Sequence, residues 1–245
     1  MYMGVNTYLS LPELYKLRLP DNPHPLVLTL SATPSRLKTV VPHMLHLLAN
    51  QFMYVRINLP AMFRNREPYD PLVIKTLQNT YSNLDIQWGG YDHGPITKIL
   101  QTLHDYKSVK AIVSIDDDIY YSPHMAATIM TLASDCVYSG NIQPHNGMHI
   151  PYGADVIVYP TSLITSKFIR HLEYLIQTPC KMHDDMMVAI TLKSLGISVR
   201  KCPRMRVSQT QEQYSTESLV ASTDRAVLYR TCDAVYAKSV EFNLL

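Results

Sequence analysis

Runs of basic residues are missing from this sequence. The formal net charge of the 245 residues is only +2, and the lysines and arginines form no cluster. A protein that binds the backbone of a nucleic acid typically carries a basic patch or stripe. The sequence therefore argues against a nucleic-acid partner.

Cysteine is also scarce. The four cysteines, Cys136, Cys180, Cys202 and Cys232, are widely separated, and none belongs to a CxxC pair. Structural zinc sites and disulfide frameworks are typically built from cysteines at regular, close spacings. We therefore predict neither a zinc site nor a disulfide framework, and this cysteine usage fits a reducing compartment.

Long apolar runs and several well-known signatures are missing as well. No apolar stretch reaches the ~20 residues that a membrane-spanning helix needs. The N-terminal residues lack the basic and then apolar pattern of a signal peptide. We therefore expect a cytoplasmic protein without a transmembrane segment, which could still dock on a membrane surface. The absence of GxGxxG, GxxxxGK[ST] and GxSxG motifs argues against a dinucleotide dehydrogenase, a P-loop enzyme and an α/β-hydrolase.

The most informative stretch that is present is AIVSIDDDIYY, residues 111–121. Its apolar start is typical of a buried strand, and Asp116, Asp117 and Asp118 follow immediately. Adjacent carboxylates repel one another unless a cation or hydrogen-bond donors offset their charge. Mg²⁺ and similar cations bind such carboxylates together with substrate phosphates. The alternative is a solvated acidic turn ahead of a helix, and for an isolated DDD the two interpretations are about equally good.

The rest of the chain alternates between strand and helix patterns. A strand, a helix and a second strand open it, which favours a parallel sheet with right-handed crossovers. Residues 137–152 are polar and turn-rich and predict a loop. Strands are predicted at 26–30, 54–59, 84–87, 111–115, 155–159 and 197–200, and helices at 37–48, 71–77, 96–106, 125–132, 162–177, 184–195 and 221–236.

This order predicts one α/β domain, a mixed but mainly parallel sheet flanked by helices. Residues 1–25 form an N-terminal appendage, and 26–205 form the domain. Within it, a nucleotide-binding half covers about 26–122 and an acceptor half about 123–205. Residues 206–245 are a C-terminal segment with a helix that packs on the core, after a polar stretch that lacks periodicity.

Two polar clusters join the triple aspartate if the sheet is parallel, because ligands of open α/β sheets bind at the carboxyl ends of the strands. Ser31 and Arg36 follow the first strand, where an arginine suits a phosphate or a base edge. Asp92 and Lys98 lie in the segment DHGPITK, ahead of a helix whose N-terminal amides can face an anion. The alternative to a binding role is a plain strand-to-helix turn for the first cluster and an exposed lysine on a helix for the second.

A third cluster, His183, Asp184 and Asp185, begins a helix that Gly196 is expected to end. Acids at a helix N-terminus interact favourably with the helix dipole, and this alone could account for both aspartates. A functional alternative is a general base, because a carboxylate can accept the proton of a sugar hydroxyl. His183 could be a metal ligand, although a lone histidine is more often structural.

Taken together these segments resemble a known family. The motifs are TLSATPSR after the first strand, DHGPITK, the strand that ends in DDD, the strand GADVIVYP and the helix that starts with DD. In this order and spacing they are similar to the GT-A glycosyltransferases, and more narrowly to small glycosyltransferase domains of large algal (chlorella-type) viruses. The resemblance covers roughly residues 26–200.

The resemblance implies a Rossmann-like GT-A fold, a nucleotide-diphosphate sugar donor (a UDP-sugar is favoured), a glycan acceptor and Mn²⁺ or Mg²⁺. It implies that Asp116 contacts the ribose or base and that Asp118, with Asp116, holds the metal, while Asp117 supports the site. By the same resemblance the nucleotide pocket includes Thr29, Ser31, Arg36, Asp92 and Lys98. The Asp184/Asp185 pair supplies the base of an inverting reaction, with Asp185 favoured.

One feature departs from that family. Many GT-A enzymes supply a late histidine as a further metal ligand, and no histidine follows His183 here. Metal binding would then rest on Asp118, phosphates and water. If the chain is viral, as the resemblance implies, its compartment would be the host cytoplasm.

Two alternatives stay open. A nucleotidyltransferase or a metal-dependent phosphohydrolase also uses carboxylates at strand ends. The sugar-activating nucleotidyltransferases usually have a glycine-rich basic loop after the first strand, and SATPSR has no glycine. The other alternative is a non-catalytic glycan-binding protein that keeps the fold.

Overall fold

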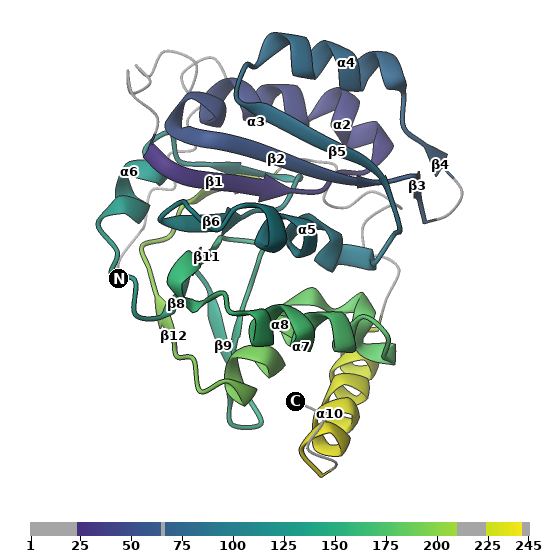
Figure 1. The fold of residues 1–245 in the computed structure, drawn as a ribbon, viewed down its shortest axis with the longest axis vertical. Coiled ribbons are helices and arrows are strands. Elements are labelled where there is room, and N and C mark those ends of the chain that lie inside the picture. Colours follow the sequence, from purple (N-terminus) through teal and green to yellow (C-terminus); the bar gives the residue numbers. More distant parts are fainter. Residues whose placement is uncertain (1–23, 65–66, 210–223, 242–245) are drawn as a thin grey trace, which may run out of the picture.

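The computed structural model describes residues 24–64, 67–209 and 224–241. Its centre is a sheet of seven strands in the order β12-β8-β11-β6-β1-β2-β5, with helices on both faces (Figure 1). The predicted mixed, mainly parallel α/β sheet is thereby confirmed. The predicted appendage, apart from residues 24 and 25, and most of the polar stretch that follows residue 208 lie outside the described residues.

The N-terminal part of the sheet is parallel, as the opening strand, helix and strand predict. β1 pairs in parallel with both β2 and β6, and β2 pairs in parallel with β5. Past β6 only β11 runs in the opposite direction: it is antiparallel to both β6 and β8, so β8 and the parallel β12 again run in the direction of β6. The strands of this sheet are β1 (His24–Leu30), β2 (Phe52–Pro60), β5 (Leu84–Gly90), β6 (Ala111–Ser114), β8 (Val137–Ser139), β11 (Ile157–Pro160) and β12 (Val199–Lys201).

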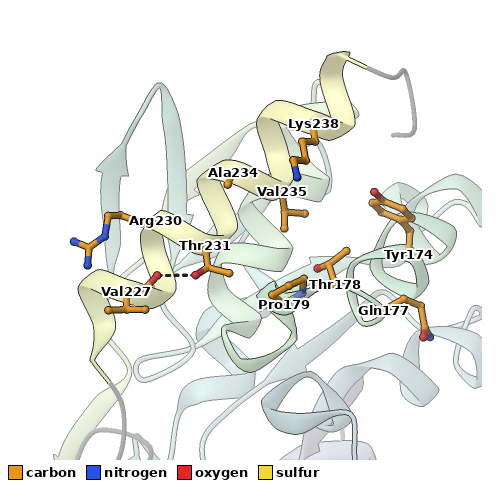
Figure 2. Close-up of a pocket in the computed structure, with 10 residues that line it drawn as sticks. All are labelled: Tyr174, Gln177, Thr178, Pro179, Val227, Arg230, Thr231, Ala234, Val235 and Lys238. Atoms are coloured by element: carbon orange, nitrogen blue, oxygen red, sulfur yellow. Dashed lines mark hydrogen bonds between the residues drawn. The ribbon is translucent and has the colours of Figure 1, made fainter.

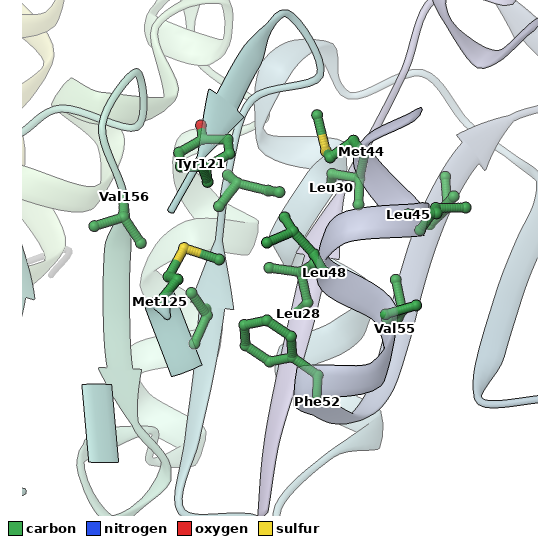
Figure 3. Close-up of a cluster of buried hydrophobic side chains, with 14 of the residues drawn as sticks. Leu28, Leu30, Met44, Leu45, Leu48, Phe52, Val55, Tyr121, Met125 and Val156 are labelled. Atoms are coloured by element: carbon green, nitrogen blue, oxygen red, sulfur yellow. The ribbon is translucent and has the colours of Figure 1, made fainter. Parts of the chain in front are cut away.

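Two apolar clusters fix the helices to the sheet. β1 shows why both faces are covered: Leu26, Leu28 and Leu30 enter one cluster and Val27 enters the other, because side chains alternate along a strand. Figure 3 shows the first cluster, where Leu28 and Leu30 lie against Met44 and Leu48. The helices are α2 (Pro34–Thr39), α3 (Val41–Leu48), α4 (Pro71–Thr80), α5 (Thr97–Asp105), α6 (Met125–Met130), α7 (Ser166–Leu175), α8 (Asp184–Ser194) and α10 (Arg225–Glu241).

The single helix predicted at 37–48 is wrong in one respect. The chain forms α2 and α3 with a break at Val40, and Pro42 occupies the first turn of α3. Proline cannot donate an amide hydrogen, so it is tolerated in the first turn and starts a new helix there. Other termini agree with the sequence: Asp70 caps α4 by accepting from the Leu72 amide at 2.8 Å, and Gly196 follows α8 with φ of +67°.

The loop predicted at 137–152 is also wrong. It contains β8 and a hairpin of β9 (Ile142–His145) and β10 (Met148–Pro151), paired antiparallel. The turn is Asn146-Gly147, with φ of +45° and +72°. Asn-Gly is the preferred pair for a two-residue hairpin turn because both residues tolerate positive φ. That dipeptide was the available signal.

A second connection ties the C-terminal part of the domain to the triple aspartate. β7 (Ile119–Tyr121), directly after it, pairs antiparallel with β13 (Arg206–Gln209). The buried carboxylate of Asp155 accepts from the amides of Met205 (3.0 Å) and Arg206 (3.1 Å).

The remaining short pair, β3 (Met62–Phe63) and β4 (Glu67–Pro68), follows β2. No helix in the described part of the chain is long and apolar enough to cross a membrane.

Two of the cysteines contradict the sequence prediction. Cys180 and Cys232 form a disulfide between α10 and the short 3₁₀ turn η4 (Pro179–Met182), while Cys136 and Cys202 are free and buried. The two partners are 52 residues apart in sequence, so spacing gave no sign of the bond. The disulfide also removes the argument from cysteine usage to a reducing compartment.

We expect the disulfide to stabilise the protein. A cross-link over a loop of this length restricts the unfolded chain, an effect of about 2–4 kcal/mol. Urea unfolding of Cys232→Ser, followed by circular dichroism, should show that loss, and dithiothreitol should produce the same loss in the wild type. The Cys180→Ser/Cys232→Ser double variant is the control and should not respond to dithiothreitol. Equal midpoints for oxidised and reduced wild type would contradict the expectation.

Candidate active site

The triple aspartate lies at the carboxyl end of β6, next to the ends of β1 and β11. Asp117 and Asp118 are buried, whereas the Asp116 side chain keeps 29% of its surface exposed. The amide of Asp116 donates to the Tyr121 hydroxyl at 2.9 Å, which fixes the turn between β6 and β7. Of the three carboxylates on this turn, Asp116 contacts Lys98, whereas Asp117 and Asp118 share Arg36.

Arg36 pairs with two of these acids. Its guanidinium lies 2.8 Å from Asp117 Oδ1 and 3.4 Å from Asp118 Oδ2, and all three side chains are largely buried. Asp117 also accepts from the Thr33 amide at 3.1 Å, and the Thr33 side chain caps α2. The loop after β1 is thereby fastened to the triple aspartate, as expected for two parallel strands that end at the same edge of the sheet.

Burial dominates the protonation of these two acids. It raises the pKa of Asp117, against the opposing effect of the Arg36 guanidinium. Burial, together with the charges of Asp116 and Asp117, raises the pKa of Asp118 to about 7. Arg36 thus has two carboxylates to offset, and it does not keep the pKa of either at its ordinary value, so this part of the site favours a further positive charge.

Lys98 joins the triple aspartate to the DD helix. Its ammonium lies 2.7 Å from Asp116 Oδ1 and 2.7 Å from Asp184 Oδ2, and the side chain is 8% exposed. Burial would lower the pKa of Lys98, but Asp116, Asp184 and Asp185 outweigh it and hold the pKa well above the ordinary value. The two acidic clusters, 66 or more residues apart in sequence, are thus one site.

The two acids of α8 differ in their environments. Burial would raise the pKa of Asp184, but the Lys98 ammonium outweighs it and the pKa is lowered. Burial and the neighbouring Asp184 charge hold the pKa of Asp185 well above its ordinary value. Asp185 Oδ1 accepts from the Gly153 amide at 3.0 Å. Asp184 is therefore an ionised partner of Lys98, while Asp185 is the more basic carboxylate.

Gly153 is a site residue that sequence reasoning missed. A Cβ there would lie 2.8 Å from Lys98 Nζ, 3.4 Å from Asp185 Oδ1 and 3.5 Å from Asp116 Oδ1. The backbone therefore approaches the charged cluster more closely than a side chain would allow. The glycine that begins GADVIVYP was the available signal, but only the fold brings it to Lys98.

Two predicted pocket residues lie beside the site rather than within it. Thr29 is fully buried in β1 and donates to the backbone carbonyl of Lys98, so it holds the first turn of α5 against the sheet. The Asp92 carboxylate accepts from the amides of Arg64 and Gly94, each at 2.8 Å, and holds the loop before α5. Ser31 lies partly exposed at the end of the first strand, beside Thr33.

The donor set fits a hard divalent cation. Five carboxylates meet here (Asp116, Asp117, Asp118, Asp184 and Asp185) against the two cations Arg36 and Lys98. Oxygen ligands of this kind suit Mg²⁺ and Mn²⁺. One group of described residues also places a histidine nitrogen and two carboxylates within 4.8 Å of one another: His183, Asp184 and Asp185. His183 can thus contribute a ligand although no later histidine is present.

No family model matches this sequence, and no curated protein matches it. Among solved structures, the chain is similar to a mannosyltransferase from Pyrobaculum calidifontis, PcManGT, solved with GDP-Man and Mn²⁺. The TM-score is 0.56 at 11% identity, over 93% of this chain and 70% of that one. The chain therefore shares the GT-A-like fold of this mannosyltransferase. The narrower likeness to viral glycosyltransferase domains is not shown by these comparisons.

Two further solved structures are similar to the chain at lower scores. The bifunctional glycosyltransferase WbbM has a TM-score of 0.37 at 11% identity, over 65% of this chain and 35% of that one. A cytidylyltransferase from Leptospira borgpetersenii has 0.45 at 13% identity, over 89% and 96%. The fold assignment rests on the mannosyltransferase alone.

Proposed function

We propose that this chain transfers a sugar, with inversion, from a nucleotide-diphosphate sugar to a hydroxyl of a glycan acceptor, in a metal-dependent reaction. One observation carries the proposal: Lys98 bridges Asp116 and Asp184 at 2.7 Å each, at the carboxyl edge of a GT-A sheet. This bridge supports a single centre with two parts. The triple aspartate at the end of β6 suits a metal-bound diphosphate, and the Asp184/Asp185 pair at the start of α8 suits a general base.

In this proposal the donor diphosphate lies at the triple aspartate. Asp118 and Asp116 would hold the metal, and Arg36 would keep Asp117 in place and add positive charge beside the phosphates. A divalent cation there supplies Lewis-acid stabilisation of the negative charge that develops on the leaving diphosphate. Thr29 would act by supporting the turn that carries Lys98, and Asp92 by holding the loop ahead of it.

Asp185 is the proposed general base. Two neighbouring carboxylates whose environments push their pKa values apart are typical of an acid–base pair with divided roles. Asp184, held ionised by Lys98, would fix the lysine, and Asp185, whose pKa is raised, would take the proton of the acceptor hydroxyl. The Gly153 amide would orient the Asp185 carboxylate.

The acceptor is proposed to be a glycan that lies against the β9–β10 hairpin. The hairpin leads through Tyr152 to Gly153, whose amide donates to the proposed base Asp185 at 3.0 Å, so the hairpin adjoins the reacting carboxylate. A UDP-sugar is the proposed donor because of the resemblance of the motifs. A GDP-sugar is the natural comparison, since the mannosyltransferase that shares the fold was solved with GDP-Man.

Calorimetric titration of UDP, GDP and CDP, each with and without Mn²⁺, tests the donor site. We expect one nucleotide to bind only with Mn²⁺, and a chelator should remove this binding. Asp118→Ala should weaken the binding at least about 10-fold, which is the lower end of the loss caused by changing residues around a bound metal. Asp135→Ala, which removes a surface acid paired with Arg200, is the control and should bind as the wild type does.

The outcomes separate the alternatives. Nucleotide binding followed by sugar release from the matching nucleotide sugar supports the glycosyltransferase. Binding of a nucleoside triphosphate with release of pyrophosphate would instead support the nucleotidyltransferase. If no nucleotide binds at saturating Mn²⁺, the proposed function is wrong.

A further inference from the structure

The C-terminal helix α10 brings a tyrosine to the edge of the candidate site. The Tyr229 ring lies edge-on to the ring of His183, with centroids 4.9 Å apart. The Tyr229 hydroxyl is hydrogen-bonded to the hydroxyl of Tyr152. His183 and Tyr152 belong to different segments, so this one side chain touches two separate parts of the chain.

Both contacted residues lie next to the segments that hold Asp185 in place. His183 is the N-cap of α8, two residues before Asp185. Tyr152 precedes Gly153, whose amide donates to Asp185 Oδ1 at 3.0 Å. Tyr229 therefore contacts the segment that carries the carboxylate and also the segment that orients it.

The position of α10 is fixed on this same face of the helix. Cys232, three residues after Tyr229, forms the disulfide to Cys180. Asp233, four residues after it, accepts from Asn146 at 2.8 Å and lies 2.9 Å from His145 Nε2 in the hairpin turn. Residues three and four apart share one face of a helix. The same face thus holds Tyr229 and two anchors.

The other face of α10 is different. It borders a groove of about 590 Å³ between α10 and the turn η4, where Val227, Thr231 and Val235 lie (Figure 2). Arg230 points away from the groove centre in that view.

From these contacts we infer that Tyr229 is a positioning residue for Asp185. Its ring fixes His183 at the start of α8, and its hydroxyl fixes Tyr152 and through it the Gly153 amide. The consequence for catalysis rests on the proposed function, whereas the consequence for the position of the Asp185 carboxylate does not.

The test compares Tyr229→Leu, Tyr229→Phe and the matched Tyr236→Leu on the same helix. Hydrogen exchange of the Gly153 amide, read by NMR on the free protein, reports its bond to Asp185. We expect Tyr229→Leu to lower the protection of this amide roughly 10-fold or more, and Tyr236→Leu to leave it unchanged. Tyr229→Phe, which keeps the ring on His183, should have an intermediate effect and guards against a leucine variant that does not fold.

Turnover gives the second measurement. A carboxylate displaced by about 1 Å costs roughly 10- to 100-fold in rate, so kcat should fall by that factor in Tyr229→Leu while nucleotide affinity changes less than about 3-fold. Unchanged Gly153 protection in Tyr229→Leu, or an equal loss in Tyr236→Leu, overturns the inference. If the wild type turns over no nucleotide sugar, the proposed function fails, but the Gly153 result still decides the role of Tyr229.

Discussion

Replacing Asp185 by Asn should reduce sugar transfer about 10²- to 10⁴-fold, the usual contribution of a general base. Asparagine keeps the size of the side chain and an oxygen that can accept from the Gly153 amide, 3.0 Å away in the wild type. It removes only the ability to take a proton. The measurement is kcat of transfer from the preferred nucleotide sugar, with nucleotide affinity determined in parallel by calorimetry.

The control for this variant is Asp70→Asn. Asp70 is also an acid at the start of a helix, where it caps α4 through the Leu72 amide, and asparagine caps a helix equally well. Asp70→Asn should transfer sugar at the wild-type rate. Transfer by Asp185→Asn within about 3-fold of wild type, with nucleotide binding intact, would exclude Asp185 as the base.

Replacing Lys98 by Met should destabilise the fold and abolish transfer. The Lys98 side chain is buried between Asp116 and Asp184, and its removal leaves two partly buried carboxylates without their partner. Breaking a buried ion pair on one side costs about 3–5 kcal/mol. The measurement is the free energy of unfolding from urea denaturation, together with transfer activity at a temperature where the variant is folded.

Lys75→Met is the comparison for Lys98→Met. Lys75 is an exposed lysine on α4, and surface substitutions of this kind usually change stability by less than about 0.5 kcal/mol. Saturating Mn²⁺ offers a second test, because a divalent cation can offset the carboxylates that Lys98→Met leaves unpaired. A Lys98→Met variant as stable as Lys75→Met would show that Lys98 does not hold the two acid clusters together.

The contacts of Arg36, Lys98 and Tyr229 form one continuous chain across the candidate site. Arg36 connects the loop after β1 to Asp117, and Lys98 connects Asp116 to Asp184. Tyr229 then contacts the residue before Asp184. Arg36 and Lys98 come from the N-terminal half of the domain, Asp184 from the start of α8 and Tyr229 from α10, so the site requires all three parts of the fold.

Local patterns in the sequence determined much of the architecture. The apolar runs that became β1 and β6 predicted buried strands, because such a strand needs apolar side chains on both faces, and the order of strand, helix and strand predicted their parallel pairing. Asp70-Pro71 and Gly196 predicted helix ends, because capping depends on residues next to each other in the chain. The Asn146-Gly147 turn shows that a local signal can also be present and be overlooked.

The sequence by itself determined which residues could carry the chemistry: the triple aspartate, Arg36, Lys98 and the DD pair are recognisable from their types and from the strand or helix that precedes or follows them. Only the tertiary structure decided which of them meet. Lys98 bridges two clusters far apart in the chain, Gly153 approaches them because it has no side chain, and Cys180 and Cys232 bond across 52 residues. Each of these contacts depends on how distant segments pack, and the identity of neighbouring residues carries no information about that.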